Sequence, residues 1–112
     1  MRVLLDECVP ASVRKLLPTQ HVQTVPQVGW RSSEDGPLLR FAELHFDVFL
    51  TVDRRIEHDH DLSTFKLGFV IARLRSNRLI NFEAVVEDLN RAVERVRAGE
   101  VIHVGPKRFV PE

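Results

Sequence analysis

The chain has 112 residues and a mass of 12.9 kDa, a size typical of one domain. Its 44% hydrophobic and 29% charged residues exclude collagen-like, disordered and disulfide-scaffold proteins. The 16 Lys and Arg residues balance 16 Asp and Glu residues, and this zero net charge argues against binding nucleic acid through bulk charge. We expect a single domain over residues 1–112, with residues 105–112 as a C-terminal tail.

The start of the chain and its single cysteine indicate the compartment. Cys8 has no second cysteine to pair with, which excludes an internal disulfide and a cysteine-based zinc site. A lone thiol is typical of a reducing compartment. The apolar run over residues 3–5 meets Asp6 and Glu7 at once, so it is too short for a signal peptide or a membrane span. We expect a cytoplasmic protein with no membrane partner.

The first part of the chain alternates short strands and helices. Residues 3–5 predict a buried strand, and Pro10 suits the first turn of a following helix. Residues 21–25 alternate and are rich in β-branched side chains, which predicts a second strand. Ser32 or Ser33 then caps a second helix. The apolar positions of these two helices are Val13, Leu16 and Leu17 in the first, and Leu38, Leu39, Ala42 and Phe46 in the second.

The second part continues the alternation. Residues 47–53 and 67–74 are apolar runs that predict a third and a fourth strand, the latter covered on both faces. Asn81 caps a long helix that ends at Gly99, and residues 101–104 form a fifth strand. This order predicts an α/β domain with a mainly parallel sheet. The long helix has its apolar side chains at helical spacing, at Phe82, Val85, Val86, Leu89, Val93 and Val96.

Acidic residues follow two of the predicted strands and open a helix. Asp6 and Glu7 end the first strand, Asp53 ends the third, and Asp35 lies in the first turn of the second helix, with Glu34 as an alternative beside it. The carboxyl ends of parallel strands meet at one edge of a sheet, where ligands bind. Converging carboxylates repel one another unless they share a hard cation such as Mg²⁺ or Mn²⁺. The alternative is that each acid has only a local role. Asp35 would be a partner of the helix dipole, Asp53 would cap the strand end, and Asp6 with Glu7 would start a loop.

Asp47 belongs to a different place. It begins the strand that Asp53 ends, so at about 3.3 Å per residue the two lie about 20 Å apart. We therefore expect Asp47 to share no metal with Asp53 and to serve a turn or a helix end.

Four segments carry a family signature: residues 3–10 (VLLDECVP), residues 28–30 (VGW) before Asp35, residues 46–54 (FDVFLTVDR) and residues 75–78 (RSNR). Together they resemble a small PIN-like family that is similar to the Mut7-C domain and to the VapC-type toxins of bacterial toxin–antitoxin pairs. The resemblance covers the chain to about residue 104. It implies a three-layer α/β/α fold with a central sheet of about five strands, and a Mg²⁺- or Mn²⁺-dependent endoribonuclease. It also implies an RNA substrate, an antitoxin protein as partner and a homodimer.

The same resemblance implies roles for particular residues. Asp6, Asp35 and Asp53 would be the catalytic metal ligands, and the metal would activate a water for in-line attack on a phosphodiester. Arg54 would sit beside the phosphate.

The sequence departs from the family pattern at two points. Cys8 stands where many PIN domains carry a small polar residue, and the fourth acid of the VapC pattern has no clear match. Glu57, Asp59 and Asp61 are the candidates for that acid. A PIN-like binding module without catalysis therefore remains an alternative function.

Basic residues gather between residues 54 and 78, several of them directly after strand ends. Most are arginines, which favour bidentate contact with phosphate over diffuse charge. We assign Arg54, Arg75 and Arg78 to substrate binding; the alternative is solvated or carboxylate-paired side chains. Trp30 could stack a base or anchor a partner protein, but packing explains a single tryptophan at least as well.

Residues 54–66 are strongly polar and predict at most one turn of helix. Within them lies a His-Asp-His-Asp run, residues 58–61, whose alternate histidines could ligate zinc or iron. The remaining histidines, His21, His45 and His103, have no partner acid on a shared helix. We therefore favour a solvated loop, with a loop at the edge of the acidic site as the alternative.

A response-regulator receiver domain is a third function to consider. There Asp6 and Glu7 would bind Mg²⁺ and Asp53 would accept a phosphoryl group. Only about 13 residues separate the third and fourth strands, too few for a crossover helix with its loops. Lys107 lies beyond the fifth strand, and the final helix of a receiver is missing from the sequence. We predict the nuclease instead.

Overall fold

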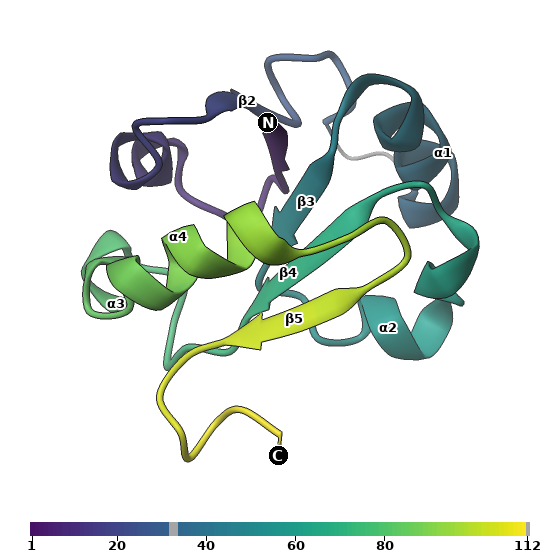
Figure 1. Cartoon of the computed structure of the whole chain (residues 1–112). Coiled ribbons are helices and arrows are strands. Elements are labelled where there is room, and N and C mark those ends of the chain that lie inside the picture. The colour runs from purple at the N-terminus through teal and green to yellow at the C-terminus, as the bar shows by residue number, and fades with distance from the viewer. Residues whose placement is uncertain (32–33, 112) are drawn as a thin grey trace.

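The centre of the molecule is a sheet of five parallel strands (Figure 1). A computed structural model of the chain describes residues 1–31 and 34–111. The strand order is β2-β1-β3-β4-β5, and every neighbouring pair runs parallel, which confirms the predicted α/β class. The strands are β1 (Arg2–Leu5), β2 (His21–Thr24), β3 (Val48–Thr51), β4 (Gly68–Ala72) and β5 (Val101–Val104).

Helices cover both faces of the sheet and complete a three-layer α/β/α arrangement (Figure 1). One face packs against η1, α3 and α4, and the other against α1, α2 and η2. Within residues 1–31 and 34–111, no helix is long and apolar enough to cross a membrane. The helices are η1 (Ala11–Leu16, a 3-10 helix), α1 (Asp35–His45), α2 (Ile56–Asp59), η2 (Leu62–Thr64, a 3-10 helix), α3 (Leu79–Glu83) and α4 (Val86–Arg95).

The central strands divide their side chains between two apolar cores. On β1, Val3 and Leu5 pack with the fully buried Phe82 of α3, whereas Leu4 packs with Phe49 on the opposite face. Every residue of β3 and of β4 is buried. The continuous apolar runs of the sequence therefore reflect strands that are covered on both faces, as predicted.

The predicted helix from Asn81 to Gly99 is wrong in its extent, because two helices occupy that stretch. Val85 interrupts them with φ −122° and ψ 23°, and its N–H donates to the carbonyl of Phe82 instead of continuing the helical ladder. Asn81 is no cap: it lies inside α3, and its side chain donates to the carbonyl (3.2 Å) and hydroxyl (2.8 Å) of Ser76. Gly99 lies beyond the end of α4, in a turn where its φ of +83° favours glycine.

The starts of the first two helices also differ in detail from expectation. Pro10 precedes η1, which is a 3-10 helix where the sequence predicted an ordinary helix. The expected caps Ser32 and Ser33 lie outside the described residues. Glu34 occupies the N-cap of α1 with an extended backbone and no side-chain capping hydrogen bond. The buried stripe of this second helix is as predicted, at Leu38, Leu39, Ala42 and Phe46.

Candidate functional site

The strand order places a topological switch point at the carboxyl ends of β1 and β3. The chain leaves β1 toward β2 on one side and leaves β3 toward β4 on the other, and such a switch point is where open α/β sheets bind ligands. The register pairs Leu5 with Leu50, so Asp6 and Thr51 are the next residues on the two strands. The N–H of Asp6 donates to the carbonyl of Leu50 at 2.9 Å. Asp53 follows two residues after Thr51, at the same edge.

Thr51 links the two acids at this switch point. Its side chain is fully buried, and its hydroxyl donates to Oδ2 of Asp6 at 2.7 Å while accepting from the N–H of Asp53 at 3.0 Å. Oδ1 of Asp6 accepts from the N–H of Glu7 at 2.8 Å. In the sequence analysis Thr51 stands only as one residue of the segment 46–54 (FDVFLTVDR). The structure gives the threonine its own role, because it fixes one acid through the carboxylate and the other through the backbone.

Asp35 completes the group of predicted acids from the start of α1. Burial raises the pKa of the Asp35 carboxyl, and the charges of Asp6 and Asp53 raise it further. Asp59 acts on that pKa in the same direction, whereas His60 lowers it. The charged groups of Asp6, Asp53, Asp59 and His60 therefore act on the Asp35 carboxyl from nearby parts of the chain. We call this group, Asp6, Asp35, Asp53, Asp59 and His60, the acidic rim.

Of the three candidates for a fourth acid, the structure favours Asp59. Glu57 turns away to His103 of β5, with Oε1 at 2.7 Å from Nε2. Asp61 begins η2 and accepts from the N–H (3.2 Å) and the hydroxyl (2.5 Å) of Ser63. Asp59, at the end of α2, is exposed and acts on the Asp35 carboxyl.

Cys8 packs beside the first acid of the rim. Its Sγ donates to Oδ2 of Asp6 at 3.5 Å and lies 3.6 Å from the hydroxyl oxygen of Thr51. Burial raises the pKa of the Cys8 thiol, and the charge of Asp6 raises it further. The thiol is therefore held protonated, as a weak donor to a carboxylate that Thr51 already binds.

A hydrogen bond brings the loop between β4 and α3 to this rim. Nδ2 of Asn77 donates to the carbonyl of Cys8 at 2.9 Å, across 69 residues of sequence. Arg75 and Arg78, the residues assigned to substrate binding, flank Asn77 and are both exposed. The loop with these two exposed arginines therefore lies beside the loop that carries Asp6.

The third assigned arginine, Arg54, directly follows Asp53 and is exposed. Its neighbour Arg55 makes the contact with the acid: its N–H donates to Oδ1 of Asp53 at 3.0 Å, and its Nε lies 3.4 Å from the same oxygen. Arg55 therefore screens part of the charge of Asp53, while Arg54 has no ion pair within the part of the chain that the structure describes.

Three other residues singled out in the sequence lie away from the acidic rim or pack locally. Asp47 accepts from the N–H of Arg2 at 2.8 Å, at the opposite end of β3 from Asp53, which confirms that the two acids are separate. Trp30 is half-buried and stacks on Phe41 with ring centroids 5.0 Å apart. His45 is exposed, with its ring 4.7 Å from the same Phe41.

The donors of the acidic rim suit a hard cation in chemical type. Carboxylate oxygens are the ligands that Mg²⁺ and Mn²⁺ prefer. Oδ2 of Asp53 accepts no hydrogen bond from residues 1–31 or 34–111, which leaves it free for such a ligand. In their present spacing, no three His, Cys, Asp or Glu side chains among the described residues could hold one metal ion.

The site therefore combines converging carboxylates, a buried hydroxyl that orders two of them, and exposed arginines on adjoining loops. Carboxylates are the groups that bind hard cations, and arginines are the groups that bind phosphate. No protein-family model, no curated protein and no solved structure matches this chain.

Proposed function

We propose that the chain is a metal-dependent endoribonuclease of the PIN-like type, the toxin component of a bacterial toxin–antitoxin pair. The convergence of Asp6, Asp35 and Asp53 at the switch point between β1 and β3 carries the proposal. Burial and the charges of Asp6 and Asp53 raise the pKa of the Asp35 carboxyl, so its ionised form is costly there, and a shared divalent cation would remove that cost.

In this proposal Asp6, Asp35 and Asp53 hold Mg²⁺ or Mn²⁺, and Asp59 is available as a further acid. When bound, the ion would supply Lewis-acid polarisation of a phosphodiester and a lowered pKa for water. Thr51 keeps the Asp6 carboxylate and the Asp53 backbone in place. A guanidinium group recognises phosphate through paired N–H donors.

The arginines on the adjoining loops are the second part of the proposal. Arg54, Arg75 and Arg78 are exposed and would contact the phosphates of RNA. Because these arginines follow β3 and β4, they would hold the RNA chain across the edge of the sheet.

Cleavage of a single-stranded RNA in Mg²⁺ or Mn²⁺ tests the proposal, with Asp6→Asn and Asp53→Asn as the variants. Each variant should lose several kcal/mol of transition-state stabilisation, so we expect its cleavage rate to fall at least about a hundredfold. Asp47→Asn is the matched control, because Asp47 directly precedes β3, at the end of that strand opposite to Asp53. We expect the control to cleave at the rate of the unmodified protein.

RNA left intact in both metals would refute the nuclease. Calorimetric titration with Mn²⁺ then identifies the alternative: binding that is lost in Asp6→Asn and Asp53→Asn, without cleavage, indicates a PIN-like binding module. The cytoplasmic location, the antitoxin partner and the homodimer belong to the same proposal, and co-purification with the product of an adjacent gene tests the partner.

The strand order favours one second candidate, a phospho-accepting receiver-like domain. Doubly wound sheets of order β2-β1-β3-β4-β5 include receivers, which use the same switch point. Two observations count against it: the helix α2 between β3 and β4 has only 4 residues, and Lys107 lines a groove beside β5, two strands from β3. Incubation with acetyl phosphate and mass spectrometry decide, since a phosphorylated Asp53 would support the receiver.

A further inference from the structure

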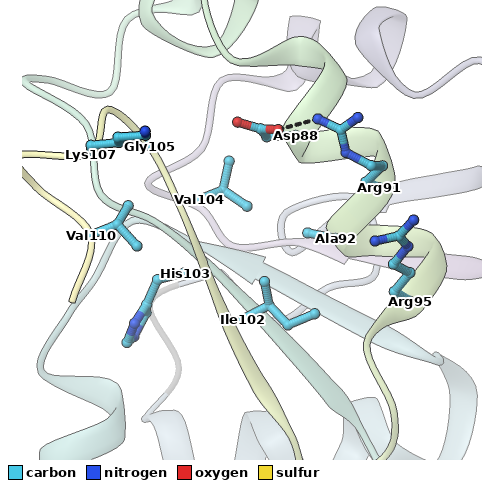
Figure 2. Close-up of a pocket in the computed structure, with 10 residues that line it drawn as sticks. All are labelled: Asp88, Arg91, Ala92, Arg95, Ile102, His103, Val104, Gly105, Lys107 and Val110. Atoms are coloured by element: carbon cyan, nitrogen blue, oxygen red, sulfur yellow. Dashed lines mark hydrogen bonds and ion pairs between the residues drawn. The ribbon is translucent and has the colours of Figure 1, made fainter. Parts of the chain in front are cut away.

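A second feature of the surface lies apart from the acidic rim. A groove of about 320 Å³ runs between α4 and β5, and we call it the α4–β5 groove (Figure 2). Aliphatic and cationic side chains line it. The aliphatic residues are Ala92, Ile102, Val104 and Val110, and the cations are Arg91, Arg95 and Lys107.

Most of the positive charge in the groove is unpaired. Asp88, one helical turn before Arg91, forms an ion pair with that arginine (Figure 2). Arg95 and Lys107 are exposed, and neither has an ion pair with any of the described residues. An occupant of the groove would therefore meet two free cations beside an apolar wall, which favours a ligand with both acidic and aliphatic groups.

The groove adjoins an open sheet edge. β5 is the last strand in the sheet. The carbonyl of Glu100 accepts a hydrogen bond from the N–H of Phe69 in β4, and the carbonyl of Val104 accepts one from Arg73, the residue after β4. Because successive residues of a strand point their backbone groups to opposite sides, Val101 and His103 present theirs to the open edge. Within residues 1–31 and 34–111, no group bonds to the N–H or C=O of these two residues. An extended peptide could pair there as an added strand.

The charge and shape of the groove decide between occupants. A second copy that paired through β5 around a two-fold axis would set α4 against α4, so that Arg91 and Arg95 would face like charges. Single-stranded RNA binds on aromatic platforms, whereas the walls here are aliphatic. An acidic peptide satisfies the cations, the walls and the open backbone together.

We propose that the α4–β5 groove binds an extended segment of a partner protein that adds a strand to the edge of β5. Every second residue of that segment is acidic or aliphatic. These side chains therefore share the face toward α4, where Arg95, Lys107 and Ile102 lie. The backbone of the segment pairs with Val101 and His103. The inference concerns a different surface from the acidic rim and does not depend on the nuclease.

Fluorescence anisotropy and amide hydrogen exchange test the proposal on the full chain. The probe is a labelled eight-residue peptide in which threonine occupies one face and aspartate and valine alternate on the other; in the control peptide lysine replaces aspartate. We expect the aspartate peptide to bind at least about tenfold more tightly than the lysine peptide. We also expect it to slow exchange at the amides of Val101 and His103.

Charge reversal in the groove provides the complementary test. Arg95→Glu with Lys107→Glu should weaken the aspartate peptide about tenfold and strengthen the lysine peptide. Arg97→Glu is the matched control: Arg97 is exposed, lies two residues beyond Arg95 and does not line the groove, so binding should not change. Circular dichroism checks that the exposed substitutions leave the fold intact.

Several outcomes would overturn the proposal. One is equal affinity for the two peptides, or no binding of either at millimolar concentration. Another is protection that spares Val101 and His103. Protection of these two amides by a single-stranded RNA, or by self-association without peptide, would assign the edge to a different occupant and reject the peptide.

Discussion

Removal of the Thr51 hydroxyl should loosen the acidic rim and destabilise the fold. Thr51→Val keeps the shape of a side chain that is 0% exposed, while it removes a donor to the Asp6 carboxylate (2.7 Å) and an acceptor for the Asp53 N–H (3.0 Å). A hydrogen bond to a charged group contributes about 1.5–3 kcal/mol and a neutral one about 0.5–1.5 kcal/mol. We expect the free energy of unfolding to fall by about 2–4 kcal/mol.

Thr51→Ser is the matched control, because it retains the hydroxyl and removes only a buried methyl group. That loss costs about 1 kcal/mol. Urea denaturation followed by circular dichroism measures both variants, and for a domain of this size a loss of 2 kcal/mol lowers Tm by about 8 °C or more. If Thr51→Val is no more destabilising than Thr51→Ser, the hydroxyl does not hold the two acids and the reasoning fails.

The same pair of variants separates the hydroxyl's structural role from its role at the site. Residues that orient metal ligands typically change metal affinity about 10–100-fold when they are lost. Thr51→Val should therefore weaken Mn²⁺ binding on that scale, whereas Thr51→Ser should retain it. Titration calorimetry at a temperature where both variants are folded measures this. Equal Mn²⁺ affinity in the two variants would show that Asp6 and Asp53 need no support from Thr51.

Three further predictions concern ionisation and backbone space. Asp35→Asn, in metal-free buffer with chelator, should stabilise the fold at neutral pH, because its raised pKa means that the ionised carboxyl is unfavourable in the folded state; the gain should vanish below the ordinary pKa of 3.8. A gain in stability that persists below this pH would show that it does not come from the ionised Asp35 carboxyl. Glu43 has a lowered pKa because it accepts from the N–H of Lys66, so its stabilisation is present above its ordinary pKa of 4.5 and lost as pH falls through the folded value. Denaturation at several pH values should show unmodified protein and Glu43→Gln converging in acid, and a constant difference would argue against the effect. Gly105→Ala places a Cβ 2.3 Å from the carbonyl oxygen of Arg73, and thermal denaturation should report a loss of about 1–3 kcal/mol; an unchanged Tm would mean that the turn after β5 shifts freely.

The sequence was sufficient for the sheet and for two of the acids because both follow simple rules. Strands covered on both faces are nearly continuous in apolar residues, and β3 (Val48–Thr51) and β4 (Gly68–Ala72) follow this rule. The parallel order then places whatever follows each strand at one edge, which is why Asp6 and Asp53 lie together. Periodicity failed at Val85, because the apolar spacing continues through a residue whose backbone leaves the helix.

Other details depend on turns of one or two residues, which periodicity does not describe. Arg54 and Arg55 are equivalent in sequence, yet only the second reaches back to Asp53 within the turn after β3. The choice among the three candidate fourth acids similarly depends on the short helix α2, which turns Glu57 toward β5 and leaves Asp59 at the rim. A local pattern locates such a segment, but only the tertiary contacts select the residue.

The balanced net charge conceals two surfaces of opposite sign. Acids gather where β1 and β3 end, and unpaired cations line the α4–β5 groove. In the proposed nuclease the acidic rim would repel phosphate until a cation is bound, so RNA would need a divalent ion to approach it. The groove carries its own positive charge and requires no ion to attract an acidic segment. Under the two proposals the surfaces differ in what they require: the groove would bind an anionic partner at the sheet edge without an ion, whereas the acidic rim would depend on a metal.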